Sequence, residues 1–287
     1  MQLLVNSLIT ASHVVLLGCG FLLILSLARF FNFAHGAIFL LGPYLALALA
    51  EYVGLHLGLA CGLGILVATT TGVLLDIGLF RPLARRRASG LILLLASLGV
   101  YVVLENLVSL AMGTETHVLW QRPAQVGYAI GDARITAIQV ATIITAVFAA
   151  GILVLGLRRS RAGLWLRAVA DDEELAACSG IPYGYVRTVS FAVGSALAAI
   201  SGVLSGLDVP LNPTMGLQPL MLCVVAAVLA APYGMVGIVG AAVVLGLARS
   251  YGAWVVGTEW QDATVFVLFL VALLSGNARC PATKSRI

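Results

Sequence analysis

Charged residues, and lysine above all, are scarce in this chain of 287 residues. Only 10% of the residues are charged and Lys284 is the single lysine, whereas 61% are hydrophobic. The mean hydropathy is +1.07. A soluble domain carries about a quarter charged residues. The composition therefore predicts a polytopic membrane protein.

The motifs of several enzyme classes are also missing. A P-loop requires G-x-x-x-x-G-K-[ST], which this sequence does not contain, so we do not expect the chain to hydrolyse ATP itself. H-E-x-x-H and G-x-S-x-G are absent, and the four histidines are far apart in the sequence. The five cysteines form no C-x-x-C pair, and we expect them to pack as small apolar residues. We predict no enzyme activity, no catalytic residue, no cofactor and no metal site.

Apolar runs that are long enough to cross a membrane fill most of the sequence. At about 20 residues per span, the length allows about eight or nine transmembrane helices, so the predicted fold is an all-α, polytopic bundle. The 31 glycines suit close packing of helices in lipid. The expected apolar segments are 8–28, 37–50, 57–80, 90–112, 136–157, 186–207, 217–231, 235–251 and 263–274.

Arginine clusters indicate how the chain is oriented. The segments 81–87 and 158–167 each contain four arginines, and further basic residues lie in the tail after residue 278. Short cytoplasmic loops of membrane proteins carry an excess of Lys and Arg. We therefore place these segments in the cytoplasm and interpret the positive charge as a topology signal, with no role in binding nucleic acid.

Two polar breaks interrupt the apolar pattern. NFAHG runs from Asn32 to Gly36 and contains His35, and NPTMG runs from Asn212 to Gly216. Both have the spacing N-x-x-x-G, and the span count gives them opposite orientations. Inverted repeats with interrupted helices point to a transport site, so these five residues are candidates for the translocation path. At the first break, a tight cytoplasmic turn between two spans is an equal alternative.

Polar side chains within spans are functional candidates as well. Glu105 and Asn106 lie toward the far end of segment 90–112, and we include both in the candidate path. Alternatively, Glu105 lies shallow enough to reach headgroup water or a neighbouring helix. Asp76 lies about one turn from Arg81, and we favour a snorkelling ion pair over a proton relay.

The segment 158–184 is the one long polar stretch, and we expect a cytoplasmic loop that carries a short helix. Its arginines are followed by four consecutive acidic residues and an Ala-rich run that ends at Gly180, with Pro182 beyond. Gly and Pro at these positions end a helix. From the residues alone, a solvated loop without a partner is as good an interpretation as a docking loop.

Several segments resemble one known family. LRAVADDEELAACSGIP, within the polar stretch, resembles the cytoplasmic coupling loop of ABC-importer permeases. FNFAHGAIFLLGPYLA, LENLVSLAMG and FAVGSALAAISGVLSG are similar to segments of the branched-chain amino-acid (Liv-type) permease family. The resemblance extends along most of the chain, which we treat as a single transmembrane domain over residues 1–287.

The resemblance implies a permease subunit of an ABC importer in the bacterial inner membrane. Its solutes would be branched-chain amino acids or related small polar compounds, with urea and short amides still open. The implied partners, besides membrane lipid, are two ATPase subunits, a periplasmic substrate-binding protein, and a homologous second permease or a second copy of this chain. The residues that it assigns to ATPase coupling are Arg167, Asp171, Asp172, Glu174, Ala176, Ala177 and Gly180.

The alternative function is a self-standing secondary transporter or channel for a small polar solute. That class needs ion-coupling groups within the membrane. Only two acidic residues, Glu105 and Asp76, lie within the expected spans. The sequence therefore favours a conduit that is driven by separate ATPase subunits.

Overall fold

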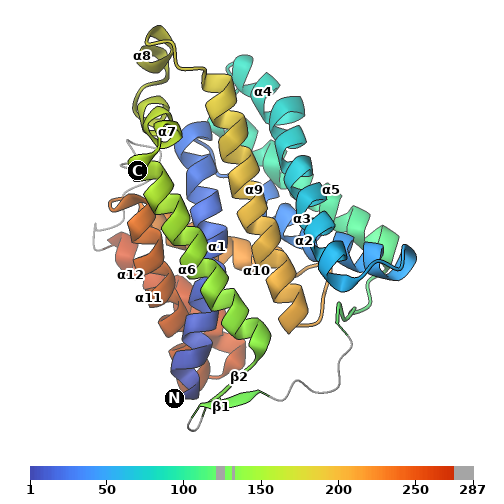
Figure 1. Ribbon diagram of the computed structural model, residues 1–287. Coiled ribbons are helices and arrows are strands. Elements are labelled where there is room, and N and C mark those ends of the chain that lie inside the picture. The colour runs from blue at the N-terminus through green and yellow to red at the C-terminus, as the bar shows by residue number, and fades with distance from the viewer. Residues whose placement is uncertain (121–126, 131–132, 275–287) are drawn as a thin grey trace.

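The computed structural model describes residues 1–120, 127–130 and 133–274, and it shows a bundle of long helices (Figure 1). This confirms the all-α prediction. Seven described helices are long and apolar enough to cross a membrane: α1 (Gln2–Ala28), α2 (Ala34–Tyr52), the continuous run Leu57–Arg85, α5 (Gly90–Met112), α6 (Ala137–Arg159), α9 (Tyr183–Asp208) and α11 (Gly234–Val255). Two further apolar helices, α10 (Leu217–Ala230) and α12 (Gln261–Leu274), have 14 residues each. The nine apolar segments of the sequence correspond to these nine helical units.

The remaining elements are short. The run from Leu57 comprises α3 (Leu57–Leu75), a π-helical segment η1 (Asp76–Phe80) and α4 (Arg81–Arg85). Helices α7 (Arg161–Asp171) and α8 (Glu173–Cys178) follow α6, and a 3₁₀ turn, η2 (Thr258–Trp260), precedes α12. The strands β1 (Tyr128–Ile130) and β2 (Ala133–Ile135) pair antiparallel, with Tyr128 opposite Ile135.

Local sequence explains where several helices begin. Thr136 and Gln139 form a capping box at α6, in which each side chain accepts a hydrogen bond from the backbone N–H of the other residue. Ser89 and Ser160 accept from backbone N–H groups in the first turns of α5 and α7. Such caps satisfy amide groups that have no partner within the helix.

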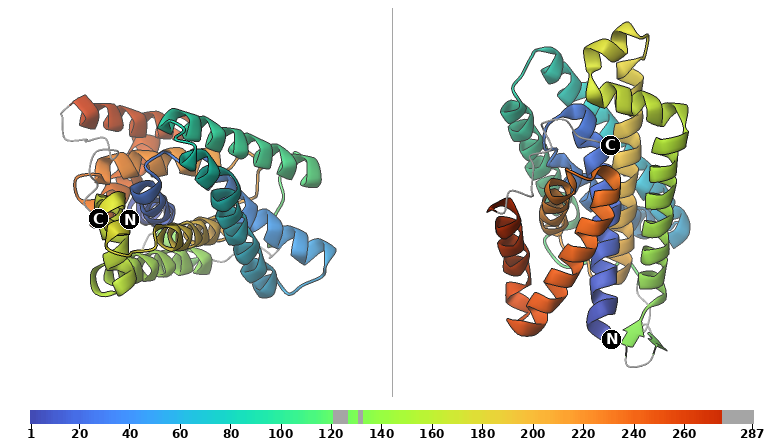
Figure 2. Two further views of the ribbon diagram at one scale, coloured as in Figure 1. Left: turned by 90° about the horizontal axis from the view of Figure 1, so that it is seen from above. Right: turned by 90° about the vertical axis from the view of Figure 1, so that its left-hand side faces the viewer.

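Helices α1 and α9 form the centre of the bundle. Most residues of α1 and α2 and half of those of α9 are buried, whereas α3, α5 and α6 leave most of their apolar side chains at least partly exposed. Helix α1 packs on α9, α10 and α11, and α9 packs on α1, α2 and α3. Seen from above, α1 is enclosed by the other helices (Figure 2). The exposed faces of the outer helices suit contact with lipid.

Glycines allow the backbone of helices α1–α3 to approach that of α9–α11 closely, and each of these contacts is reciprocal. A Cβ on Gly20 would lie 2.6 Å from the carbonyl oxygen of Gly194, and a Cβ on Gly194 would lie 2.8 Å from that of Gly20. The glycines of the two N-x-x-x-G breaks show the same relation, at 3.0 Å from Gly36 and 2.7 Å from Gly216. This reciprocity is what a two-fold relation between α1–α3 and α9–α11 produces.

One end of the bundle carries the arginine clusters. We call it the arginine-rich end; it contains α4, α7, α8 and the last turn of α6 with Arg158 and Arg159 (Figure 1). The N-terminus and the β1–β2 hairpin lie at the opposite end. The polar stretch 158–184 differs from the expected loop with one short helix, because it contains two helices and the end of α6.

Candidate functional site

The first polar break is a turn that leads the chain back into the bundle. Helix α1 ends at Arg29, which has a left-handed backbone (φ 54°), and α2 begins at Ala34. In the first turn of α2, Nε2 of His35 lies 3.2 Å from the carbonyl oxygen of Leu17, a residue in the middle of α1. Helix α2 therefore starts deep inside the bundle, beside the centre of α1. The break is therefore a turn between α1 and α2, and its role in a translocation path stays a prediction.

Two side chains of this break are buried, and each has a polar atom without a hydrogen-bond partner. Asn32 is 5% exposed and His35 is 1% exposed. Asn32 Oδ1 and His35 Nδ1 have no hydrogen-bond partner among the described residues. Most buried polar groups in proteins are hydrogen-bonded, so such atoms point to hydration or to a changing environment. The pair is suited to a region that rearranges.

The second polar break begins at the surface of the protein and ends inside the helix bundle. Asn212 is exposed, and its Oδ1 accepts from the backbone N–H and the hydroxyl of Thr214 at 3.1 and 3.0 Å. This Asx turn leads to Gly216, which precedes α10 and meets Gly36. The two glycines of the breaks thus lie together, whereas Asn32 is buried and Asn212 faces outward.

The two candidates on α5 differ in exposure. Glu105 is partly exposed, and Asn106 is exposed and donates from Nδ2 to the carbonyl of Val102 at 2.7 Å. Tyr101, one turn before Glu105, lies beside the second break, because a Cβ on Gly216 would be 3.4 Å from its ring. The structure therefore brings Tyr101, which the sequence did not single out, closer to the breaks than Asn106.

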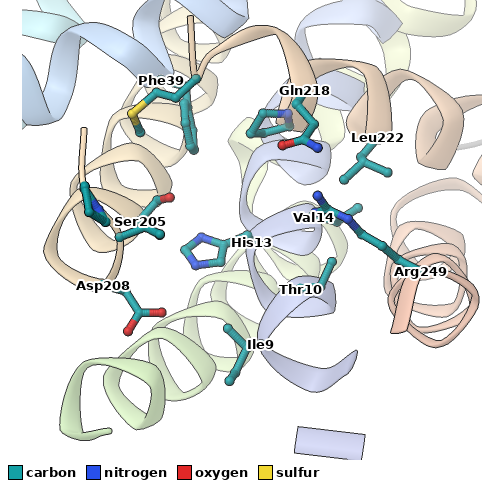
Figure 3. A pocket seen from close by; sticks show the side chains of 14 residues that line it. Ile9, Thr10, His13, Val14, Phe39, Ser205, Asp208, Gln218, Leu222 and Arg249 are labelled. Carbon is teal, nitrogen blue, oxygen red and sulfur yellow. The ribbon is translucent and has the colours of Figure 1, made fainter. Parts of the chain in front are cut away.

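A cavity of about 350 Å³ lies beside the second break, between α1, α9, α10 and α11 (Figure 3). Much of its wall is apolar, from side chains that include Val14, Phe39, Met215 and Leu222. Its polar lining comes from His13, Ser205, Asp208, Gln218 and Arg249. Figure 3 shows Asp208 and Arg249 on opposite sides of His13. The cavity thus combines an apolar wall with one acidic and one basic side chain.

The charges of the cavity are held in place by neighbours. Asp208 accepts from Gln139 Nε2 at 3.2 and 3.3 Å and from Thr136 Oγ1 at 3.4 Å, all neutral donors at the start of α6. Arg249 Nε lies 3.3 Å from Asp262 Oδ1, and Gln218 also donates to Asp262. His13 Nδ1 lies 3.3 Å from Ser201 Oγ. None of these residues was predicted from the sequence as part of a site, although a lone arginine within an apolar span, such as Arg249, is itself a signal.

A buried ion cluster lies near the arginine-rich end. Asp76 is fully buried, and its Oδ2 accepts from Arg81 Nη2 at 3.1 Å. Its Oδ1 accepts from Arg187 Nε at 2.8 Å, and the Arg187 side chain is only 3% exposed. The ion pair with Arg81 is confirmed, but Asp76 does not snorkel toward water. Arg187, in the second turn of α9, is a further partner that the sequence analysis missed.

Helix α7 is fastened to the bundle. Leu166 and Val169 are buried against it, and a Cβ on Gly163 would lie 2.6 Å from the carbonyl oxygen of Gly156. Arg29 Nη2 donates to the carbonyls of Ala170 and Asp171 at 3.2 and 3.4 Å. A cation at the C-terminal end of a helix is stabilising. Among the predicted coupling residues, Arg167 is partly buried on α7 and its Nε contacts the carbonyl of Gly163 at 3.4 Å.

Helix α8 stands away from the bundle at the arginine-rich end (Figure 1). Asp172 caps it by accepting from the N–H of Leu175 at 3.1 Å. Gly180 ends it with a φ of +79°, and Ile181 N–H donates to the carbonyl of Ala176 at 3.1 Å, the pattern of a Schellman motif. The exposed residues of this loop are Asp171, Asp172, Glu173, Glu174, Leu175, Ala177, Cys178, Ser179 and Gly180. Ala176 is the exception, because it is buried within the chain at 4% exposure.

Within residues 1–120, 127–130 and 133–274, no three His, Cys, Asp or Glu side chains are grouped so that they could hold a metal ion. Cys19 and Cys223 are buried and free, Cys61 is partly buried, and Cys178 is exposed. The expected burial of cysteines therefore holds for Cys19 and Cys223 but not for Cys178. Cys280 lies outside the described residues.

Comparison with known proteins connects this geometry with a family. Residues 3–273 match a family model described as the permease component of branched-chain amino acid transport systems. The LivH permease of Escherichia coli K12 is 29% identical, over 96% of this chain and 92% of that protein. The BraD permease of Pseudomonas aeruginosa is 28% identical, over 96% and 93%. Both are named as high-affinity branched-chain amino acid transport system permease proteins.

One solved structure has a similar fold. It is that of PsaBC from Streptococcus pneumoniae in complex with Fab, with a TM-score of 0.50 and 14% sequence identity. The match covers 95% of this chain and 91% of that chain. At this identity the likeness concerns the helix arrangement alone.

Proposed function

Because the chain belongs to the family of permease components of branched-chain amino acid transport systems, we propose that it is the membrane subunit of an ABC importer. It would act in the bacterial inner membrane and move branched-chain amino acids or related small polar solutes. Separate ATPase subunits would supply the energy, and a periplasmic binding protein would deliver the solute. The lack of a P-loop in this chain supports the division of labour.

The orientation follows from the positive charges. The arginine-rich end would face the cytoplasm, because short cytoplasmic loops carry the excess of arginine. The opposite end, with the N-terminus and the β1–β2 hairpin, would face the binding protein (Figure 1). A homologous second permease, or a second copy of this chain, would complete the membrane part of the importer.

The observation that carries the proposal is the protruding helix α8. Glu174 is exposed and Leu175 is 67% exposed, so α8 presents an apolar side chain beside acidic ones. Asp172 caps the start of this helix and Gly180 ends it. The combination of an exposed leucine with acidic side chains on a projecting helix supports a contact with another protein, although a single exposed leucine does not require one. We assign α8 as the segment that contacts the ATPase subunit.

The connection from α8 to the membrane is short. Only four residues, Ser179 to Pro182, separate α8 from α9, and Gly180 sets the direction of the turn. Helix α9 then packs on α1, α2 and α3, and Arg187 fastens it to Asp76 at the end of α3. A displacement of α8 would therefore reach the centre of the bundle through α9. The glycine contact of Gly20 on α1 with Gly194 on α9 lies along this route.

Co-purification tests the proposal directly. We expect the tagged chain to bring down ATPase subunits from its own membranes, and Glu174→Arg or Gly180→Trp to reduce the recovered ATPase about tenfold or more, as for a residue at the centre of an interface. Glu174 is exposed, so its variant should keep the melting temperature of the wild type. The control is Arg86→Gln, which removes an exposed charge at the same end but outside α8, and should leave the ATPase yield unchanged.

Two results would contradict the proposal. One is a yield of ATPase that is the same for wild type and both α8 variants. The other is a wild-type chain that purifies without ATPase and moves solute in vesicles without ATP. The second result would favour the self-standing transporter, and Glu105 on α5 would become the first residue to replace.

A further inference from the structure

The cavity beside the C-terminal end of α9 is lined by the carboxylate of Asp208, which lies where a negative charge is unfavourable. Asp208 is the last residue of α9, where the exposed carbonyls of the helix give a partial negative charge. Its hydrogen-bond donors, Gln139 and Thr136, are neutral, and no arginine or lysine among the described residues forms an ion pair with it. Asp208 is partly exposed, and a cation beside it would offset the unfavourable interaction of its negative charge with this end of the helix.

The opposite wall provides the complementary charge. Arg249 is part of the cavity lining, and its recorded ion pair to Asp262 uses Nε, at 3.3 Å. The terminal nitrogens of its guanidinium have no recorded partner among the described residues, and Figure 3 shows this end directed at the cavity. Terminal guanidinium nitrogens bind a carboxylate through two parallel hydrogen bonds. Asp262 holds the arginine through Nε, and Gln218, which also lines the cavity, donates to Asp262.

The size and the remaining wall suit a small solute with an apolar group. About 350 Å³ is at the lower end of the range of roughly 300–1,000 Å³ that is usual for small-molecule sites. Val14, Phe39 and Leu222 form apolar walls of the cavity. A neutral solute such as urea would leave Asp208 without a counter-charge and the terminal nitrogens of Arg249 without an anionic acceptor.

We propose that this cavity binds the solute as a zwitterionic α-amino acid with an apolar side chain. The α-carboxylate contacts Arg249, the α-ammonium group contacts Asp208, and the side chain lies against the apolar wall. The inference rests on the proposed import of amino acids, and it excludes the urea and amide solutes that the sequence leaves open. Asp208 and Arg249 become residues that determine specificity within this single chain.

The proposal is tested by protection of a cysteine in the cavity. Ser205→Cys places a thiol in the wall, in a background with Cys61→Ser, Cys178→Ser and Cys280→Ser, so that only the buried Cys19 and Cys223 remain besides it. The transporter complex in nanodiscs, without binding protein, is labelled with a small methanethiosulfonate at increasing leucine concentration. We expect leucine to slow the labelling. At the same concentrations 3-methylbutylamine, 4-methylpentanoate, urea and acetamide should not.

Variants of the two charged residues then assign the contacts. Asp208→Asn and Arg249→Gln should each raise the leucine concentration needed for half-protection about tenfold or more, the loss expected for one hydrogen bond to a charged group. Arg249→Lys keeps the charge but not the paired donors, and should lie between wild type and Arg249→Gln. Glu115→Gln, at an exposed carboxylate outside the cavity lining, is the control and should leave protection unchanged.

Transport separates the failure of this inference from that of the proposed function. If the wild-type importer takes up no amino acid in vesicles, the proposed function fails. If uptake is normal but leucine does not protect the cavity cysteine, the cavity is not the solute site. Protection by the amine alone or by urea, or protection that is equal in wild type and in Asp208→Asn and Arg249→Gln, also overturns the zwitterion assignment.

Discussion

Replacing Asp76 by alanine is expected to destabilise the protein by about 3–5 kcal/mol, because it leaves a buried guanidinium without its counter-charge. Asp76 is fully buried, and its two oxygens accept from Arg187 at 2.8 Å and Arg81 at 3.1 Å. Arg81 is partly exposed and can reach water, but Arg187 cannot, since its side chain is 3% exposed. The melting temperature of the detergent-purified variant measures the loss.

The double variant Asp76→Leu with Arg187→Leu is the matched control for this prediction. It removes both members of the buried pair, and a buried pair that is replaced by apolar residues of similar volume often costs little. We expect it to recover most of the melting temperature. An Asp76→Ala protein that melts like the wild type would show that Arg187 finds water or another acceptor, contrary to the buried arrangement described above.

Replacing Gly202 by valine is expected to separate α2 from α9 and to abolish uptake. A Cβ on Gly202 would overlap the carbonyl oxygen of Phe39 and lie 3.2 Å from Pro43 Cδ. Pro43 has no N–H, so the carbonyl of Phe39, four residues earlier in α2, loses its helical donor and faces the glycine instead. Because a backbone atom fills the space, the overlap can be removed only if one of the two helices moves. We expect the variant to lose about 3 kcal/mol of folding stability, the upper end of ordinary overpacking.

Gly240→Val on α11 is the matched control for the glycine contact. This residue is exposed, and an added Cβ would meet nothing within 4 Å, so the variant tests only the cost of a β-branched residue in a helix. Its melting temperature and uptake should stay close to those of the wild type. Equal losses in the two valine variants would mean that helix propensity, and not the contact with Phe39, determines the effect.

The candidate site was only partly accessible to sequence reasoning. The spacing N-x-x-x-G singled out Gly36 and Gly216, and these two glycines do meet in the structure. The same pattern made Asn32 and Asn212 equivalent candidates for the path, whereas in the structure Asn32 is buried and Asn212 is exposed in an Asx turn. A short motif records which residues occupy a turn, whereas the direction of each side chain depends on how the turn enters the bundle.

The charged residues of the cavity and of the buried cluster were missed for a related reason. Arg249, Arg187 and Asp208 are single charges within or next to apolar runs, and each pairs with residues that are far away in the sequence. Arg187 reaches Asp76 across 111 positions, for example. Apolar periodicity reports that a segment can lie in a membrane, but it carries no information about which helix lies beside it.

The sequence by itself determined the class of this protein, the number and extent of its apolar helices, and the arginine-rich end. These follow from the hydrophobic effect and the cost of placing charge in lipid, which act on each segment separately. Only the tertiary structure decided that α2 starts beside the middle of α1, that Ala176 is buried, and that Asp208 and Arg249 line one cavity. Those features depend on close contacts between helices, at Gly20 with Gly194 and at Gly202 with Phe39, and packing of that kind is a property of the whole bundle.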